Sequence, residues 1–130
     1  MGAQVRRLVV VADDDDAIRL LCRVNLELEG YRVEEAANAR ELERLTEEED
    51  VALVLLDVHL GSEDGVEVAR TLRERYPQIA IAFLSGSVDF GERSAAVSDA
   101  AIRKPFTLEQ FTETVHRLAR GTDRPPAASP

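Results

Sequence analysis

The sequence predicts an α/β protein built on an open, doubly wound, five-stranded parallel sheet. Apolar runs of strand length alternate with amphipathic stretches of helix length along the chain, which indicates repeated βα units. Residues 8–11 and 51–56 form unbroken apolar runs, as expected for central parallel strands that are covered on both faces. Right-handed crossovers between such strands place helices on both sides of the sheet.

The other elements follow in chain order. We expect three further strands, at residues 31–36, 79–84 and 100–103. We expect helices at residues 15–29, 39–48, 65–76 and 90–98, and a last one from residue 107. Gly30 is placed to end the first helix, and Thr107 and Gln110 form a capping box that opens the last one.

The length of 130 residues suits one domain with a single core. We assign residues 1–121 to this domain. After Gly121 the composition shifts to Thr-Asp-Arg-Pro-Pro-Ala-Ala-Ser-Pro, so residues 122–130 are expected to be a disordered tail or a truncated linker.

Charge and cysteine content exclude several classes of function. The net charge of -9 repels phosphate backbones and anionic lipids, so we expect no direct nucleic-acid or membrane binding. No apolar run approaches the ~20 residues of a membrane helix, and we expect a cytoplasmic protein. The single cysteine, Cys22, lies on an apolar helix face and is expected to be a core thiol. His59 and His116 are too isolated in sequence for a zinc site, and His116 is expected at the surface.

Acidic residues follow two of the predicted central strands. Asp13 and Asp14 come after the first strand and Asp57 after the third, so the carboxyl ends of neighbouring strands bring them together. Helix capping accounts for Asp15 and Asp16. It does not account for the other three, because like charges ~4 Å apart repel by roughly 4 kcal/mol at an effective dielectric near 20. We therefore expect a cation, and oxygen ligands with room for water favour Mg²⁺.

Two further polar residues end the remaining strands. Ser85 follows the fourth strand and Lys104, before Pro105, follows the fifth. Lys104 is the only lysine among sixteen Lys and Arg residues, which suggests a site suited to a compact ammonium group. Chance under an arginine-rich composition is the alternative explanation. The Lys-Pro peptide bond is a candidate for the cis form.

These residues resemble those of the receiver domain of two-component response regulators, over about residues 7–120. The resemblance is carried by the acidic pair, by the run of residues 55–65 (Leu-Leu-Asp-Val-His-Leu-Gly-Ser-Glu-Asp-Gly), by Ser85-Gly86 and by Lys104-Pro105-Phe106. Four such elements in order make it highly specific. The resemblance implies the flavodoxin-like receiver fold, with the strand order 2-1-3-4-5.

The resemblance also implies the roles of the site residues. Asp57 is then the phosphoryl acceptor, and Asp13, Asp14, Asp57 and the main-chain carbonyl of His59 hold Mg²⁺. Ser85 and Lys104 contact the phosphoryl oxygens. The donor is a phosphohistidine on a sensor histidine kinase or phosphotransfer protein, and the domain catalyses only its own phosphorylation and dephosphorylation.

Two positions depart from the family pattern. Gly61 replaces a common proline, and Ala101 stands where most members have Tyr or Phe, so no aromatic ring is available to swing inward on activation. We hypothesise that phosphorylation instead reorders residues 85–89 and the helix after them, and with it the face formed by the fourth helix, fifth strand and fifth helix. The His59 side chain either tunes water access together with Ser87 or is an exposed loop residue.

Other functions fit less well. A haloacid-dehalogenase-type hydrolase would carry an aspartate at position 59, and a flavin binder would not place four aspartates after its first strand, where they repel phosphate. A docking module that is never phosphorylated remains the alternative, because of Ala101. The sequence names neither the kinase nor the output, and it leaves self-association into a homodimer open.

Overall fold

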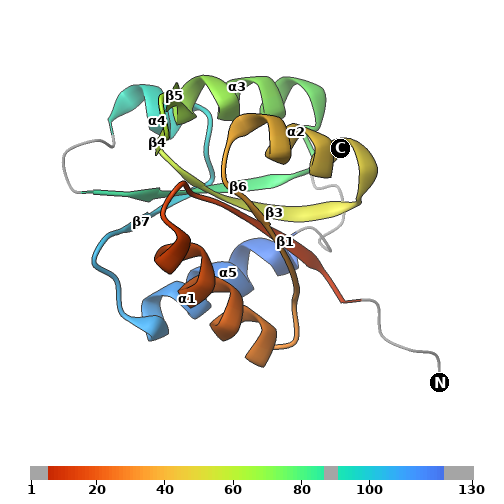
Figure 1. The fold of residues 1–130 in the computed structure, drawn as a ribbon, viewed down its shortest axis with the longest axis vertical. Helices are drawn as coiled ribbons and strands as arrows, with labels where there is room; N and C mark the ends of the chain where they lie inside the picture. Colours follow the sequence, from red (N-terminus) through yellow and green to blue (C-terminus); the bar gives the residue numbers. More distant parts are fainter. Residues whose placement is uncertain (1–5, 87–90, 122–130) are drawn as a thin grey trace.

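The computed structural model describes residues 6–86 and 91–121. A central sheet is covered by α2, α3 and α4 on one face and by α1 and α5 on the other (Figure 1). The main strands are β1 (Leu8–Ala12), β2 (Arg32–Ala36), β3 (Val51–Asp57), β6 (Ala80–Ser85) and β7 (Ala100–Arg103). The helices are α1 (Asp16–Leu28), α2 (Ala39–Glu48), α3 (Gly65–Arg75), α4 (Glu92–Ala96) and α5 (Leu108–Gly121).

The predicted doubly wound sheet is confirmed. All neighbouring pairs in it are parallel, and the strand order is β2-β1-β3-β6-β7, which is the expected 2-1-3-4-5 order when only these five strands are counted. Every side chain of β1 is buried, because the strand is central and helices cover both faces. The three strands β1, β3 and β6 therefore end at one edge of the sheet, where the functional candidates follow them.

Two apolar layers hold this sheet. On the α2–α3 face, Val10, Val54 and Phe83 pack under Leu42 and Leu72. On the α1–α5 face the strands contribute Val11, Leu55, Leu84 and Ile102, which contact the helix residues Cys22, Leu26, Phe111 and Val115. Cys22 is a buried free thiol as predicted, and burial raises its pKa to about 12.

Local capping places the helices as the sequence predicted. Asp15 caps α1, with its Oδ1 accepting from the backbone N–H of Ala17 at 2.9 Å. Gly30 follows the end of α1 with a φ of +96°, a conformation that favours glycine. Thr107 and Gln110 form the predicted capping box at the start of α5. No helix in the described ranges is long and apolar enough to cross a membrane.

The structure adds a hairpin that sequence periodicity does not predict. β4 (His59–Leu60) and β5 (Glu63–Asp64) pair in antiparallel fashion, and the turn between them contains Gly61 with a φ of +64°. Strands of two residues are too short to show an alternation of apolar and polar side chains. The helix predicted at residues 90–98 is also shorter, since α4 spans only Glu92–Ala96. Residues 87–90, with Ser87 and Phe90, lie outside the described residues, as does the predicted tail at 122–130.

His116 is more than the ordinary surface residue that was expected. Its imidazole is half-buried between α5 and the end of α1, with Nδ1 at 2.6 Å from the Tyr31 hydroxyl and Nε2 at 3.0 Å from a Glu29 carboxylate oxygen. The helical position of His116 does not reveal these contacts, because both partners lie more than eighty residues earlier in the chain.

Candidate functional site

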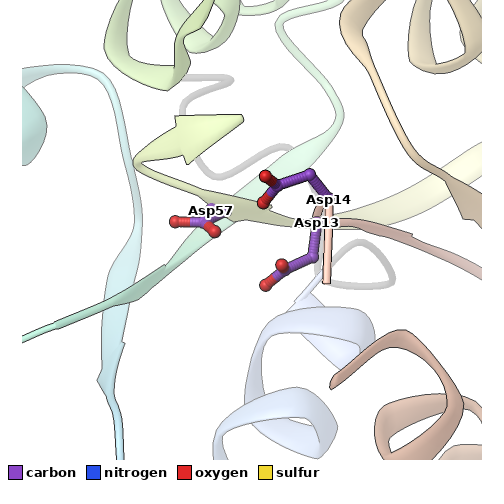
Figure 2. Close-up of side chains that lie close together, drawn as sticks. All are labelled: Asp13, Asp14 and Asp57. Carbon is purple, nitrogen blue, oxygen red and sulfur yellow. The ribbon is translucent and has the colours of Figure 1, made fainter. Parts of the chain in front are cut away.

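Three carboxylates gather where β1 and β3 end. Asp13 and Asp14 follow β1 directly, and Asp57 is the last residue of β3. β1 and β3 are neighbours in the sheet, with Ala12 opposite Leu56, so the residues after them meet at the same edge. One oxygen from each carboxylate lies within 4.8 Å of the others, and Figure 2 shows the three side chains lying close together. This cluster is the acidic edge, and sequence reasoning predicted its three members.

Lys104 reaches the acidic edge from the end of β7. Its Nζ lies 3.0 Å from Asp13 Oδ2 and 3.5 Å from Asp57 Oδ2. The Asp13 side chain is fully buried and also accepts a hydrogen bond from the backbone N–H of Asp15 at 2.9 Å. One ammonium group thus faces two of the three carboxylates, and the edge keeps an excess of negative charge.

The pKa values reflect this imbalance. Burial raises the pKa of Asp57 above its ordinary value, and the Asp13 charge raises it further, while the backbone N–H of His59 and the Lys104 ammonium act in the opposite direction. Burial alone would lower the pKa of Lys104, but hydrogen bonding to Asp13 and the charges of Asp13 and Asp57 outweigh it and raise that pKa. Lys104 is therefore fully charged near neutral pH, and ionisation of Asp57 is less favourable than that of an ordinary aspartate.

Asp14 provides an oxygen that is open to a ligand. Its side chain is exposed, and within residues 6–86 and 91–121 its carboxylate has no hydrogen bond or ion pair. Three oxygen donors with a shortage of countercharge suit a hard divalent ion, and no sulfur or imidazole donor belongs to the cluster. The residues present therefore fit Mg²⁺.

Ser85 lies beside this edge but faces its own chain. The residue is fully buried at the end of β6, and its hydroxyl donates to the carbonyl oxygen of Gly86 at 2.6 Å. The backbone N–H of Lys104 donates to the Ser85 carbonyl at 2.7 Å, which joins the ends of β6 and β7. The peptide bond between Lys104 and Pro105 is cis, the form for which the sequence made it a candidate.

His59 and Ala101 occupy different surroundings. His59 is exposed in β4, and its backbone N–H donates to Asp57 Oδ1 at 3.0 Å. This contact aims the Asp57 carboxylate. Ala101 is exposed on β7 opposite Phe83, so the surface there carries only a methyl group.

Gly65 is a site residue that sequence reasoning missed. A Cβ atom at this position would lie 2.2 Å from the carbonyl oxygen of Asp57 and 2.7 Å from that of Val58. The backbone N–H of Gly65 also donates to the Val58 carbonyl at 2.7 Å. Only glycine permits this approach of α3 to the end of β3. The available signal is a glycine directly after an N-cap aspartate, Asp64, at the start of a helix.

Comparisons with known proteins agree with this geometry. Residues 9–116 match the family model of the response regulator receiver domain. The transcriptional regulatory protein SrrA of Staphylococcus aureus is 34% identical over 117 residues, which are 88% of this chain and 48% of SrrA. This chain therefore spans about half the length of that relative.

Solved structures give the same result. A CheY-like response regulator receiver domain protein from Methanospirillum hungatei has a TM-score of 0.83 and 30% identity, with 92% of this chain and 98% of that chain covered. A response regulator from Thermotoga maritima has a TM-score of 0.77 and 28% identity, with 88% and 98% covered. The chain belongs to the response regulator receiver domain family of two-component systems.

Proposed function

We propose that this receiver domain accepts a phosphoryl group on Asp57 from a phosphohistidine of a sensor histidine kinase or a phosphotransfer protein. The observation that carries the proposal is the position of the Asp57 carboxylate. It lies at the acidic edge, within 4.8 Å of oxygens of Asp13 and Asp14 and 3.5 Å from the Lys104 ammonium. A carboxylate held beside a cation and a metal-binding pair is equipped to attack phosphorus.

The reaction balances without a further reactant. An Asp57 carboxylate oxygen forms a bond to phosphorus as the phosphorus–nitrogen bond of the phosphohistidine breaks, and the imidazole leaves with the electron pair. Negative charge then spreads over the phosphoryl oxygens. Lys104 offsets this charge from one side, and the Ser85 hydroxyl becomes a donor once it releases the Gly86 carbonyl. Both the transfer and the later hydrolysis are self-directed reactions of the domain.

Magnesium fits the same arrangement. Asp13, Asp14, Asp57 and the main-chain carbonyl of His59 are the groups that would hold it. When bound, the ion supplies positive charge to the phosphoryl oxygens and relieves the repulsion among the carboxylates. Asp14 is exposed and unpaired within the described part of the chain, so its carboxylate is the one most accessible to an incoming ion.

A protein donor needs a docking surface near the acidic edge, and α1 offers one. Four of the five large apolar side chains that are exposed among the described residues belong to this helix: Leu20, Leu21, Val24 and Leu28. Leu20, Val24 and Leu28 are spaced four residues apart and so share one face. Exposed apolar stripes of this kind are typical of protein-binding surfaces. The helix begins beside the acidic edge, three residues after Asp13.

Incubation with Mg²⁺ and a small phosphodonor, followed by intact mass measurement, tests the proposal. We expect the parent protein to gain one labile phosphoryl group and Asp57→Ala to gain none. Asp50→Asn, which changes an exposed aspartate at the other end of β3, is the matched control and should behave as the parent. A parent that stays unmodified, or an Asp57→Ala variant that is still modified, would contradict the assignment.

The docking role of α1 is tested by changing the donor in the same assay. Val24→Ser should leave modification by the small phosphodonor unchanged, because that donor needs no docking surface. Transfer from a phosphorylated histidine kinase should slow. Equal rates with both donors would remove α1 from the proposal without affecting Asp57.

The alternative function is a docking module that is never phosphorylated. The apolar stripe on α1 and the small Ala101 on β7 are compatible with it. The mass experiment separates the two functions, because a docking module leaves Asp57 unmodified. The division into a domain at residues 1–121 and a tail at 122–130 stays a prediction.

A further inference from the structure

The α4 helix is joined to the acceptor side of the molecule by one arginine. Arg93, the second residue of α4, donates to Asp64 Oδ2 at 2.9 Å and to Glu67 Oε2 at 3.2 Å. Asp64 ends the hairpin that follows Asp57, and Glu67 lies in the first turn of α3. These two contacts, here termed the Arg93 bridge, cross from the segment after β6 to the segment after β3.

Asp64 is closely connected to the acceptor. Its Oδ1 caps α3 by accepting from the backbone N–H of Val66 at 2.9 Å, so its side chain is fixed on one side before Arg93 binds the other. It pairs with His59 in the β4–β5 hairpin, and the backbone N–H of His59 donates to Asp57 Oδ1 at 3.0 Å. The Arg93 bridge therefore ends two contacts away from the Asp57 carboxylate.

The other end of the bridge follows Ser85. In this structure the Ser85 hydroxyl donates to the carbonyl of Gly86, at 2.6 Å, and is fully buried. Donation to a phosphoryl group on Asp57 requires that this hydrogen bond breaks, which frees the Gly86 carbonyl to rearrange. α4 begins six residues after Gly86 in the sequence. The Arg93 bridge opposes this rearrangement because it fixes α4 to α3.

Because residue 101 is alanine, this position of β7 has no aromatic ring that could couple the acidic edge to α4. The β7 position opposite Phe83 carries a methyl group, which has no alternative buried rotamer to exchange for an exposed one. Coupling between the acidic edge and α4 then has to pass through groups that touch both sides. Among the described side chains of α4, Arg93 is the one with ion pairs to the acceptor side.

We propose that Arg93 is a positioning residue that holds the unphosphorylated arrangement and so lowers the affinity of the acidic edge for a phosphoryl group. The inference rests on the proposed function, since it needs Asp57 as the acceptor. Loss of the bridge shifts the equilibrium toward the arrangement in which Ser85 faces Asp57. A ligand that prefers this arrangement then binds more tightly.

The test is a titration with beryllofluoride, a phosphoryl mimic, in the presence of Mg²⁺, followed by calorimetry. Arg93→Gln should bind the mimic about two- to fivefold more tightly than the parent, the range expected for removing one exposed ion-pair network. Glu67→Gln should show a smaller effect of the same sign. Arg70→Gln is the matched control, because Arg70 pairs with the same Glu67 at 3.4 Å but within α3, without reaching α4.

Salt and a conservative replacement separate positioning from a general loss of structure. The difference between Arg93→Gln and the parent should shrink at ~1 M salt, where exposed charges are screened within about 3 Å. Arg93→Lys, which keeps the charge, should fall between the two. Thermal unfolding of each variant verifies that it is folded.

The outcomes are distinguishable. Equal affinities for Arg93→Gln, Arg70→Gln and the parent would overturn the role of Arg93 while leaving Asp57 as the acceptor. Weaker binding by Arg93→Gln would reverse the sign of the inference and also overturn it. A parent protein that binds no beryllofluoride would instead overturn the proposed function, and the role of Arg93 with it.

Discussion

The interior of the sheet is stabilised by buried apolar side chains, whereas its acidic edge brings like charges together. In the interior, β1, β3 and β6 place apolar side chains against helices on both faces, and each fully buried large side chain contributes about 1.5–3 kcal/mol. At the edge, three carboxylates lie close together and one ammonium group contacts two of them. The interior makes the fold stable enough to hold these charges together. The edge uses part of that stability to keep three like charges close together.

The largest expected effect comes from breaking the interior. Phe83→Ala removes a fully buried ring on β6 and should cost about 3–5 kcal/mol in the free energy of unfolding. Phe106→Ala is the control, because Phe106 is only half-buried and stacks on Phe111 at a centroid distance of 5.2 Å. Urea unfolding of both variants measures the difference. Similar losses would contradict the view that the central strands dominate stability.

A smaller loss is expected where the interior meets the edge. Gly65→Ala forces a Cβ against the Asp57 and Val58 carbonyl oxygens and should cost about 1–3 kcal/mol, the usual range for overpacking. Gly91→Ala is the control, since a Cβ at that position meets open space. Gly65→Ala should also slow phosphoryl acceptance, because relief of the clash displaces Asp57. The measurements are urea unfolding and the small-phosphodonor assay.

The smallest effect has the opposite sign. Asp57→Asn should stabilise the metal-free protein by about 0.5–2 kcal/mol at neutral pH, because it removes a buried charge from a crowded cluster. The raised pKa means that the folded state binds the Asp57 proton more tightly than the unfolded state does. Its contribution to stability is then fully present below about pH 4 and is lost as pH rises through the folded pKa.

Unfolding measurements at several pH values check this sign. The difference in the free energy of unfolding between Asp57→Asn and the parent should shrink as pH falls from neutral toward about 4, because protonation makes the parent carboxyl group uncharged as well. Added Mg²⁺ should stabilise the parent more than the variant, because the variant lacks one carboxylate ligand. Asp50→Asn should show neither effect. A variant less stable than the parent at neutral pH would contradict the account of the acidic edge.

Most of the site could be predicted because its members follow strands. Asp13 and Asp57 each come directly after an apolar run and Lys104 directly follows the last strand, and parallel strands deliver the residues after them to one edge. The hairpin at residues 59–64 and the role of Gly65 could not be predicted in this way. Both depend on how closely α3 approaches β3, which periodicity does not record.

The sequence by itself determined the α/β class, the order of elements and the convergence of acidic residues, because the periods of apolar residues and strand ends are local properties of the chain. Tertiary structure decided the rest. Only packing set the Ser85 hydroxyl on its own Gly86 carbonyl, His116 between Tyr31 and Glu29, and Arg93 on Asp64 and Glu67. Each of these depends on side-chain directions and distances between elements far apart in the chain, which no local pattern specifies.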